Sequence, residues 1–187
     1  SAALPGEPGA AYGLAKRLME CETFAATDAG EVDGTVARMW AFVGPLLPLD
    51  IHYAAGNFVA DALAGRPILV TGDPGTVRSY LYPIDLVCWL LAALTRGRPG
   101  VAYNVGSDVE TTIGELAATV ARISGNTAGI RLSGVTNRHA TNRPAADCYV
   151  PDTTRARTEL GVTQTVDLND AIERTLRWHC PDLRCNS

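Results

Sequence analysis

The sequence predicts an α/β fold, and two observations lead to this prediction. Segments whose apolar residues recur at helical spacing alternate along the chain with short, almost wholly apolar runs of strand length. Glycine or proline stands between most of these segments, where the chain is expected to turn. With 187 residues, of which 47% are hydrophobic and 19% charged, the chain can form one domain with a real core or two small lobes.

The first two segments are a helix and a buried strand. Residues from Ala10 to about Ala26 carry apolar side chains at helical spacing, which predicts a helix with one buried stripe formed by Leu14, Leu18, Cys21 and Phe24. Residues 35–43 are almost all apolar, and such a run is typical of a central parallel strand that is covered on both faces. Gly44 and Pro45 end this strand.

The middle of the chain continues the alternation. Residues 52–64 predict a second helix that Gly65 closes, and residues 68–70 predict a short strand. Residues 72–75 form a turn, after which residues 78–82 alternate in the manner of an exposed strand.

Further helices and a strand complete the pattern. Residues 84–96 predict a mostly apolar helix and residues 101–105 a strand. The next helix has one apolar face, made of Ile113, Leu116, Ala117, Val120 and Ile123. Residues 125–142 are irregular and rich in Gly, Ser, Thr and Asn, and short helices follow over 153–160 and 168–178. Asp167 is placed to cap the last helix.

Tyr12 and Lys16 are the first candidates for chemistry. A step of four residues on a helix puts both side chains on one face, so a phenol lies beside an ammonium group. A neighbouring positive charge favours the phenolate, which makes the pair a candidate acid/base group. The alternative is a phenol packed on the core with a solvated lysine nearby, since this spacing also arises by chance.

The charge pattern excludes several partners. The net charge is -4 and the longest basic run is Lys16-Arg17, so we expect no binding to nucleic acid or to an anionic membrane. The longest apolar stretch, residues 86–94, is too short to cross a bilayer, and the amino terminus lacks the pattern of a signal peptide. We expect a cytoplasmic protein.

The cysteines predict neither a disulfide framework nor a metal site. There are five, they are scattered, and no Cys-x-x-Cys pair is present: Cys21, Cys88, Cys148, Cys180 and Cys185. His179 adds a third potential ligand near the last two, but three ligands on a terminal segment make a poor tetrahedral site.

Five segments, taken in order, resemble a known family. They are Tyr12-Gly-Leu-Ala-Lys16, Arg38-Met-Trp-Ala-Phe-Val-Gly-Pro45, Gly72-Asp73 with Arg78-Ser-Tyr-Leu-Tyr82 and Asp85, Tyr103-Asn-Val-Gly-Ser107, and Arg143-Pro144 followed by Asp152 and Glu159-Leu-Gly161. Their order is similar to the carboxyl-terminal half of the extended short-chain dehydrogenase/reductases, in the NAD-dependent epimerase/dehydratase group that modifies nucleotide sugars. The resemblance covers nearly the whole chain.

The resemblance implies a fold and a division into domains. It implies the remaining part of a Rossmann-like, doubly wound parallel sheet together with a smaller α/β lobe that binds substrate. The cofactor domain would contain residues 1–46 and 82–105. The substrate lobe would contain residues 47–81 and 106–187.

The resemblance also implies roles for individual residues. Tyr12 would remove the proton of a sugar hydroxyl, while Lys16 would favour the phenolate and bond the ribose of NAD, with NADP also possible. The backbone at Trp40 and Ala41 would face the nicotinamide. Arg78 would clamp the diphosphate of the nucleotide sugar, because a guanidinium fits phosphate oxygens in pairs. The alternative for this arginine is a solvated side chain or a structural ion pair.

Three further residues resemble substrate ligands of the family. Arg143 matches a second arginine of the diphosphate clamp, with the same alternatives as Arg78. Asn57 resembles a substrate-side asparagine of the decarboxylase branch, and its alternative is a helix residue with a satisfied amide. Tyr82 would touch the nucleotide or pack in the core.

The chain departs from the family pattern at several positions. Ala41 stands where the strand usually has asparagine, so one substrate contact is missing or is supplied elsewhere. Ser79 replaces the usual aspartate and Pro74 disturbs the Gly-Asp-Gly turn, which indicates a different loop around the nucleotide.

The glycine-rich turn that holds the pyrophosphate of the cofactor in this family is absent from the sequence. Gly6, Gly9 and Gly13 do not replace it, because their spacing is wrong and no strand precedes them. A third catalytic residue, a serine or threonine before the tyrosine, would also lie upstream of Ser1. We therefore expect a fragment of a longer enzyme.

The expected activity of the intact protein is that of an NAD-dependent nucleotide-sugar epimerase or dehydratase. It would act by transient oxidation of a sugar hydroxyl, a first step that the branches of the family share, and it would form a homodimer. Two alternatives remain open: a non-catalytic fragment that binds nucleotide sugars or serves as a scaffold, and an NADPH-dependent ketone reductase that consumes its cofactor.

Overall fold

The computed structural model describes residues 10–51, 53–133 and 147–181 of the chain. The predictions made for His52, Arg143, Pro144 and Cys185, and for residues 1–9 and 134–142, lie outside the described residues.

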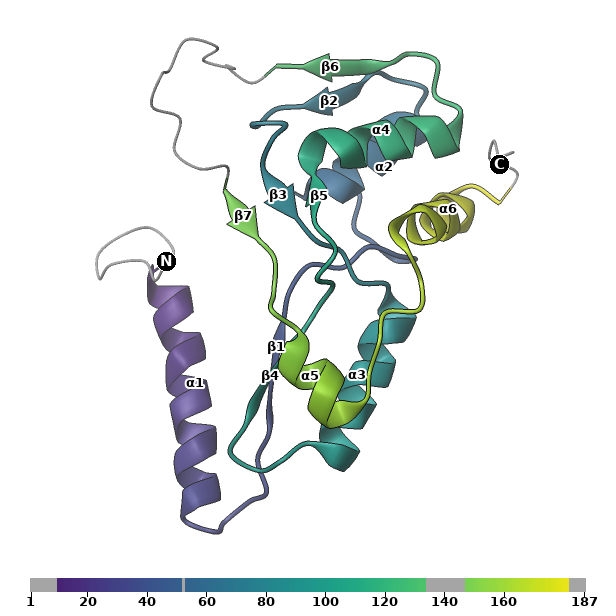
Figure 1. The fold of residues 1–187 in the computed structure, drawn as a ribbon. Coiled ribbons are helices and arrows are strands. Elements are labelled where there is room, and N and C mark those ends of the chain that lie inside the picture. Colours follow the sequence, from purple (N-terminus) through teal and green to yellow (C-terminus); the bar gives the residue numbers. More distant parts are fainter. Residues whose placement is uncertain (1–9, 52, 134–146, 182–187) are drawn as a thin grey trace.

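Helices and strands alternate as the sequence predicts, and the α/β class with parallel strands is confirmed (Figure 1). The elements are α1 (Ala10–Asp28), β1 (Val36–Met39), α2 (Ala54–Leu63), β2 (Ile68–Val70), β3 (Val77–Arg78), α3 (Pro83–Arg96), β4 (Ala102–Val105), β5 (Thr111–Thr112), α4 (Ile113–Ser124), β6 (Ile130–Leu132), β7 (Cys148–Tyr149), α5 (Thr154–Leu160) and α6 (Leu168–His179).

The described strands form three small sheets. β1 pairs in parallel with β4, and β2 pairs in parallel with β6. β3 lies between β5, to which it is antiparallel, and β7, to which it is parallel. Figure 1 shows α1 standing apart on one side of the β1–β4 pair, with α3 and α5 on the other side.

The predicted strand over 35–43 is divided between two partners. Trp40 N–H donates to the Val105 carbonyl of β4 at 3.1 Å, which is the last bond to that strand. Beyond it, Leu81 N–H donates to the Ala41 carbonyl at 3.0 Å and Val43 N–H to the Leu81 carbonyl at 3.2 Å. The chain therefore changes partner at the point where Trp40 and Ala41 stand.

The prediction that this strand is covered on both faces is wrong for the described residues. β1 is only partly buried, and the Met39 side chain is 58% exposed. A continuous apolar run indicates a strand with both faces buried, but it does not identify the elements that bury them or place those elements among the described residues.

The predicted buried stripe on the first helix is also wrong. Leu14 and Leu18 are 59% and 55% exposed, Cys21 is exposed and Phe24 is half-buried. The helical spacing was correct, so the error lies in the partner: among the described elements none packs along this face of α1 (Figure 1).

Two further expectations are corrected. Residues 78–82 do not form an exposed strand, because Ser79, Tyr80 and Leu81 are buried and only Val77–Arg78 forms β3. Residues 130–132 are not irregular but form β6, which pairs with β2. Just before β6, the Gly129 carbonyl accepts a hydrogen bond from Ile68 N–H of β2 at 2.9 Å. Both changes come from pairing between distant segments, which local spacing does not reveal.

Buried side chains fall into two clusters. The larger one joins α2, β2, α4 and α6 and contains Phe58, Ile68, Leu116 and Ile172. The smaller one joins α3 and β4 with Leu160 of α5. The division into a cofactor domain and a substrate lobe stays a prediction, and α5, which was assigned to the lobe, packs against α3 and β4.

The caps follow the local sequence. Asp167 accepts a hydrogen bond from Asp170 N–H at 2.9 Å, so its predicted role as the N-cap of α6 is confirmed. Thr112 and Glu115 form a capping box at the start of α4.

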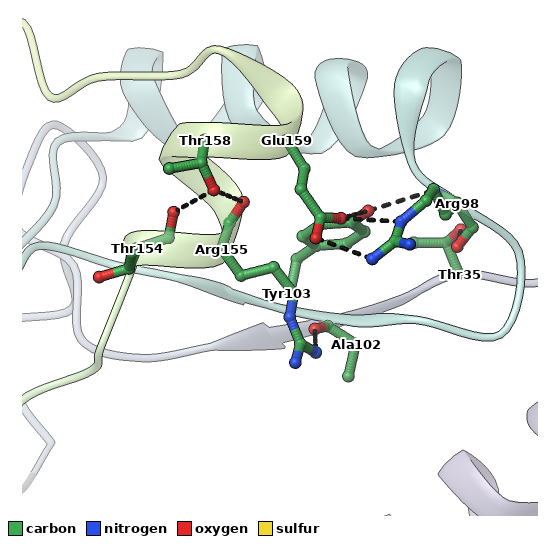
Figure 2. A network of polar contacts seen from close by, with 8 residues as sticks. All are labelled: Thr35, Arg98, Ala102, Tyr103, Thr154, Arg155, Thr158 and Glu159. Carbon is green, nitrogen blue, oxygen red and sulfur yellow. Dashed lines mark hydrogen bonds and ion pairs between the residues drawn. The ribbon is translucent and has the colours of Figure 1, made fainter.

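A buried phenol ties α5 to β4 and to the turn that precedes it (Figure 2). The Tyr103 hydroxyl donates to the Glu159 carboxylate at 2.8 Å and accepts from Arg98 N–H at 3.1 Å. Arg98 also binds this carboxylate through two N–H groups, at 3.0 and 2.8 Å. Tyr103 is fully buried, so its hydroxyl depends on these partners.

Replacing Tyr103 with phenylalanine is expected to lower the free energy of unfolding by about 1–3 kcal/mol, because the Arg98 N–H loses its acceptor and Glu159 a donor. Urea unfolding measures the change. The matched control is Tyr53→Phe, whose ring is 63% exposed and which should unfold like the original chain. Equal stability of the two variants would contradict the role given to the network.

The network also predicts a pH dependence. The Tyr103 hydroxyl, followed by the Arg98 guanidinium, holds the pKa of Glu159 below its ordinary value of 4.5. A carboxylate whose pKa is lower in the folded state stabilises the fold at pH values above its pKa in the unfolded state. It loses that effect as the pH falls through its pKa in the folded state. The difference in stability between the original chain and Tyr103→Phe should therefore shrink as the pH falls below the ordinary value of 4.5.

Candidate functional site

A cavity of about 980 Å³ opens where β1 leaves β4. One wall is the segment that follows β1, with Trp40, Ala41 and residues 47–49. The opposite walls are α2, the end of β2 and β3, which contribute polar groups that include Asn57 and Arg78. A cavity of this size, lined mainly by apolar side chains with a few polar groups, is typical of a small-molecule site.

The cavity brings together four of the predicted site residues. Trp40, Ala41, Asn57 and Arg78 all line it, although they come from three separate segments of the chain. Asn57 is exposed on α2, and among the described residues its amide has no hydrogen-bond partner. The exposed amide can bond water or a ligand at the cavity, and the role of Asn57 as a substrate ligand stays a prediction.

Arg78 is held in place from three directions. Its Nη1 donates to the Val77 carbonyl at 2.8 Å and to the Asp147 carbonyl at 3.0 Å, and its Nη2 binds the Asp147 carboxylate at 2.8 Å. The guanidinium also lies 5.8 Å from the centre of the Tyr149 ring. The ion pair with Asp147 is one of the alternatives that we considered for Arg78, and the same contacts hold its guanidinium at the cavity wall, so its role as a diphosphate ligand stays a prediction.

An aromatic pair forms the wall next to Arg78. The rings of Trp40 and Tyr149 lie 4.2 Å apart between centres, tilted by 39°. Because Tyr149 lies opposite Arg78 in the β3–β7 register, one phenol contacts both the indole and the guanidinium. This contact joins the end of β1 to β3 across the cavity wall.

Tyr80 also lines the cavity, but its chemistry differs from that expected of Tyr12. Burial raises the pKa of Tyr80 to about 12, against the opposing effect of the Arg78 charge. This phenol therefore remains protonated near neutral pH and is not suited to act as a base there.

Tyr12 and Lys16 lie on one face of α1, as predicted. The Lys16 Nζ lies 5.6 Å from the centre of the Tyr12 ring, and the phenol is 71% exposed. Among the described residues, no core packs against this phenol, and the role of the pair stays a prediction. Neither residue is part of the cavity lining.

Comparison with known proteins decides the family. Residues 1–106, more than half of the chain, match the family described as "NAD dependent epimerase/dehydratase family". The chain belongs to this family. Its members modify nucleotide sugars, and the chain spans about half the length, or less, of the first curated relatives it matches.

Three relatives illustrate the match. The dTDP-glucose 4,6-dehydratase of Streptomyces niveus is 30% identical over 182 residues, which cover 94% of this chain and 50% of the relative. The UDP-glucose 4-epimerase of Thermotoga maritima, solved with UDP-glucose, is 25% identical with a TM-score of 0.77, covering 92% and 54%. The Bordetella bronchiseptica enzyme WbmF, solved with NAD+ and UDP, is 22% identical with a TM-score of 0.77, covering 98% and 56%.

Tyr82, a candidate substrate ligand from the epimerase/dehydratase pattern, does not line the cavity. The Arg174 guanidinium of α6 lies 5.3 Å from its ring centre, and Tyr82 packs beside Gly44. This placement corresponds to the packing role that we considered for it.

Sequence reasoning missed some residues of the cavity. Tyr149 follows a segment without periodicity and lies on a two-residue strand, so no local signal marked it. Tyr80 was visible within the arginine-led segment and alternates with Arg78, which could have placed both on one wall. Asp61 and Arg66 form an ion pair at 2.8 Å on the lining, and only their closeness in sequence hinted at it.

Two negative findings concern the described residues. In the described ranges, no three or more His, Cys, Asp and Glu side chains gather as they would to hold a metal ion. In the same ranges, no helix combines the length and the apolar character needed to cross a membrane.

Proposed function

We propose that the intact protein is an NAD-dependent nucleotide-sugar epimerase or dehydratase that oxidises a sugar hydroxyl transiently. The observation that carries this proposal is the cavity, which joins the Trp40 and Ala41 segment to Arg78 in a chain of the epimerase/dehydratase family. The dTDP-glucose 4,6-dehydratase and UDP-glucose 4-epimerase relatives support this class of substrate.

Described residues fit the nicotinamide half of the cofactor. Lys16 offers an exposed ammonium donor for a ribose hydroxyl, and Trp40 and Ala41 form a wall of the cavity. NAD, or NADP in its place, would supply the acceptor for hydride when bound. The complex of WbmF with NAD+ is consistent with this choice.

The reaction assigns two tasks to α1. Tyr12 would accept the proton of the sugar hydroxyl at its phenolic oxygen, because that proton must leave as the carbon is oxidised. Lys16 would keep a positive charge beside the phenolate and stabilise it. The exposure of Tyr12 leaves its oxygen accessible to a substrate.

Arg78 would bind the diphosphate of the nucleotide sugar. It is the guanidinium on the described cavity wall that the Asp147 and Tyr149 contacts hold in a fixed orientation. Two phosphate oxygens suit its planar donors, and the half-buried position of Arg78 strengthens the charge interaction. The volume of about 980 Å³ is at the upper end of the usual range for small-molecule sites, as a nucleotide sugar requires.

Replacing Arg78 with alanine is expected to weaken the binding of UDP or dTDP by about 10- to 100-fold, since one charge-assisted contact is lost. Calorimetric titration of the chain with each nucleotide measures this effect. The matched control is Arg131→Ala on β6, because Arg131 is exposed and lies outside the cavity lining. Unchanged affinity in Arg78→Ala would contradict the assignment.

A second candidate is a module that binds nucleotide sugars without turnover. It is favoured by the fact that Tyr12 and Lys16 are not part of the cavity lining, whereas Arg78 is. Titration of the intact protein with NAD separates the two candidates. An enzyme should bind both NAD and the nucleotide, whereas a module without turnover should bind the nucleotide alone. An NADPH-dependent ketone reductase would instead consume its cofactor. The expected homodimer and cytoplasmic location remain part of the proposal for the intact enzyme.

A further inference from the structure

We propose that Glu20 is a positioning residue. Together with Arg38 it fixes the position of α1 relative to β1, and this position aligns Tyr12 and Lys16 with the Trp40 end of the cavity. This inference rests on the proposed function, because it concerns the same tyrosine and lysine. It adds a residue that neither the sequence pattern nor the cavity lining had marked.

The contact between Glu20 and Arg38 is bidentate. Arg38 Nε donates to Oε1 of Glu20 at 2.8 Å and Nη2 donates to Oε2 at 2.6 Å. The hydrogen bonds from Arg38 hold the pKa of Glu20 below its ordinary value, although burial opposes them. Two parallel N–H···O bonds fix an orientation as well as a distance, which a single contact to lysine would not do.

The pair lies on the face of α1 that carries the proposed chemistry. Tyr12, Lys16 and Glu20 follow one another at steps of four residues, so their side chains lie in one row along the helix. Arg38 lies on β1, and Trp40 follows the end of this strand while still bonded to the Val105 carbonyl at 3.1 Å, so the two side chains, two residues apart in extended backbone, point to the same face. The Glu20–Arg38 contact thus joins the row on α1 to the strand face that leads to the cavity.

The directions of the two elements bring Lys16 level with Trp40 along the strand. Figure 1 shows α1 and β1 running in opposite directions, joined at one end by the turn between them. From the ion pair, Lys16 lies about 6 Å back along the helix axis and Tyr12 about 12 Å, at 1.5 Å per residue. Trp40 lies about 7 Å forward along the strand, at 3.3 Å per residue. Because the directions are opposed, both displacements point the same way.

Few other contacts set the position of α1. At its carboxyl end, Gly34 N–H donates to the Thr27 hydroxyl at 3.1 Å and Gly34 packs against Thr23. In the described part of the chain, the Arg38 bonds are the side-chain hydrogen bonds that reach α1 from beyond Gly34. A helix fixed at one end can swing, and Glu20 supplies the second point about 12 Å from Tyr12.

The test compares Glu20→Gln with Glu22→Gln. Glu22 is exposed on the same helix, so its variant loses the same charge without touching the pair. In the intact protein, assayed with dTDP-glucose and UDP-glucose, Glu20→Gln is expected to lower kcat by about 10- to 100-fold, because small misplacements of reacting groups have large effects on rate. The KM for the nucleotide sugar should stay within about two-fold, because Glu20 does not line the cavity.

A second measurement on the 187-residue chain needs no substrate. The five cysteines are replaced with serine, and new cysteines at residues 14 and 109 carry spin labels. Pulsed electron paramagnetic resonance then measures the distance between α1 and the loop after β4. Both positions are exposed, at 59% and 57%. The original chain and Glu22→Gln should give one narrow distribution, and Glu20→Gln a broad or shifted one. The double exchange of Glu20→Arg with Arg38→Glu should recover the narrow distribution and part of kcat.

The outcomes separate this inference from the proposed function. An unchanged distribution in Glu20→Gln overturns the positioning role, whatever the activity. A broadened distribution with unchanged kcat overturns it as well, because the position of α1 then does not matter for the reaction. If the original intact protein turns over neither sugar, the proposed function fails, while the distance measurement still decides whether Glu20 fixes α1.

Discussion

Replacing Tyr12 with phenylalanine in the intact protein is expected to lower turnover of a nucleotide sugar by about 10²- to 10⁴-fold, the contribution of a positioned acid/base group. The phenylalanine ring keeps the shape of the side chain and removes only the hydroxyl that would accept the proton. Because Tyr12 is 71% exposed, the free energy of unfolding should not change. Steady-state turnover with dTDP-glucose and UDP-glucose measures the effect.

Tyr103→Phe is the matched control for this experiment. Both variants lose a phenolic hydroxyl, but that of Tyr103 is buried between Glu159 and Arg98 and lies away from the cavity. The two variants should have opposite effects: Tyr12→Phe loses turnover and keeps its stability, whereas Tyr103→Phe loses stability and keeps its turnover. Retained turnover in Tyr12→Phe would dismiss this residue as the base.

Replacing Asp85 with alanine is expected to lower the free energy of unfolding by about 3–5 kcal/mol, because three donors lose their acceptor in a buried place. Asp85 stands in the first turn of α3 and is 2% exposed. Its carboxylate accepts from the Thr165 hydroxyl at 2.5 Å and from Thr165 N–H and Val166 N–H, each at 3.1 Å. It thereby ties α3 to the segment that leads into α6.

Two variants sharpen the test on Asp85. Asp85→Asn keeps one carbonyl acceptor and should lose less stability than Asp85→Ala. Asp170→Asn removes an exposed carboxylate on α6, whose contact with Arg174 spans 3.6 Å, and should change stability by less than about 0.5 kcal/mol. Urea unfolding of all three gives the order. A loss in Asp85→Ala no larger than in Asp170→Asn would contradict the account of this carboxylate.

The sequence sufficed for the elements that local chemistry determines. The spacing of Leu116, Val120 and Ile123 places the buried face of α4 correctly, and Asp167 caps α6 as predicted. These features depend on residues within a few positions of each other, so the sequence holds all the information they need. The α/β class followed from their alternation.

Contacts between distant segments were not accessible to the same reasoning. The backbone of Trp40 bonds to β4, whereas the backbone of Ala41 and Val43 bonds to Leu81. No local pattern in the sequence marks this change of hydrogen-bond partner. Leu14 and Leu18 have the spacing of a buried stripe, yet no described element covers them. Spacing tells which face of an element is apolar, but not which segment will cover that face.

The candidate site shows the same division. The resemblance brought Trp40, Ala41, Asn57 and Arg78 forward from three segments, and the structure gathers all four around one cavity. Tyr149 could not be foreseen, because its place beside Trp40 depends on the pairing of β7 with β3. The Glu20–Arg38 pair joins residues 18 positions apart in the sequence and likewise depends on how α1 meets β1.

A single-turnover experiment on the intact protein, with NAD bound and dTDP-glucose or UDP-glucose added, tests the central claim most directly. Absorbance of the reduced nicotinamide should rise and then fall, without net consumption of cofactor, and the rise should be absent in Tyr12→Phe. A steady loss of NADPH with a ketone substrate, or product formation with no rise at all, would contradict transient oxidation at this site.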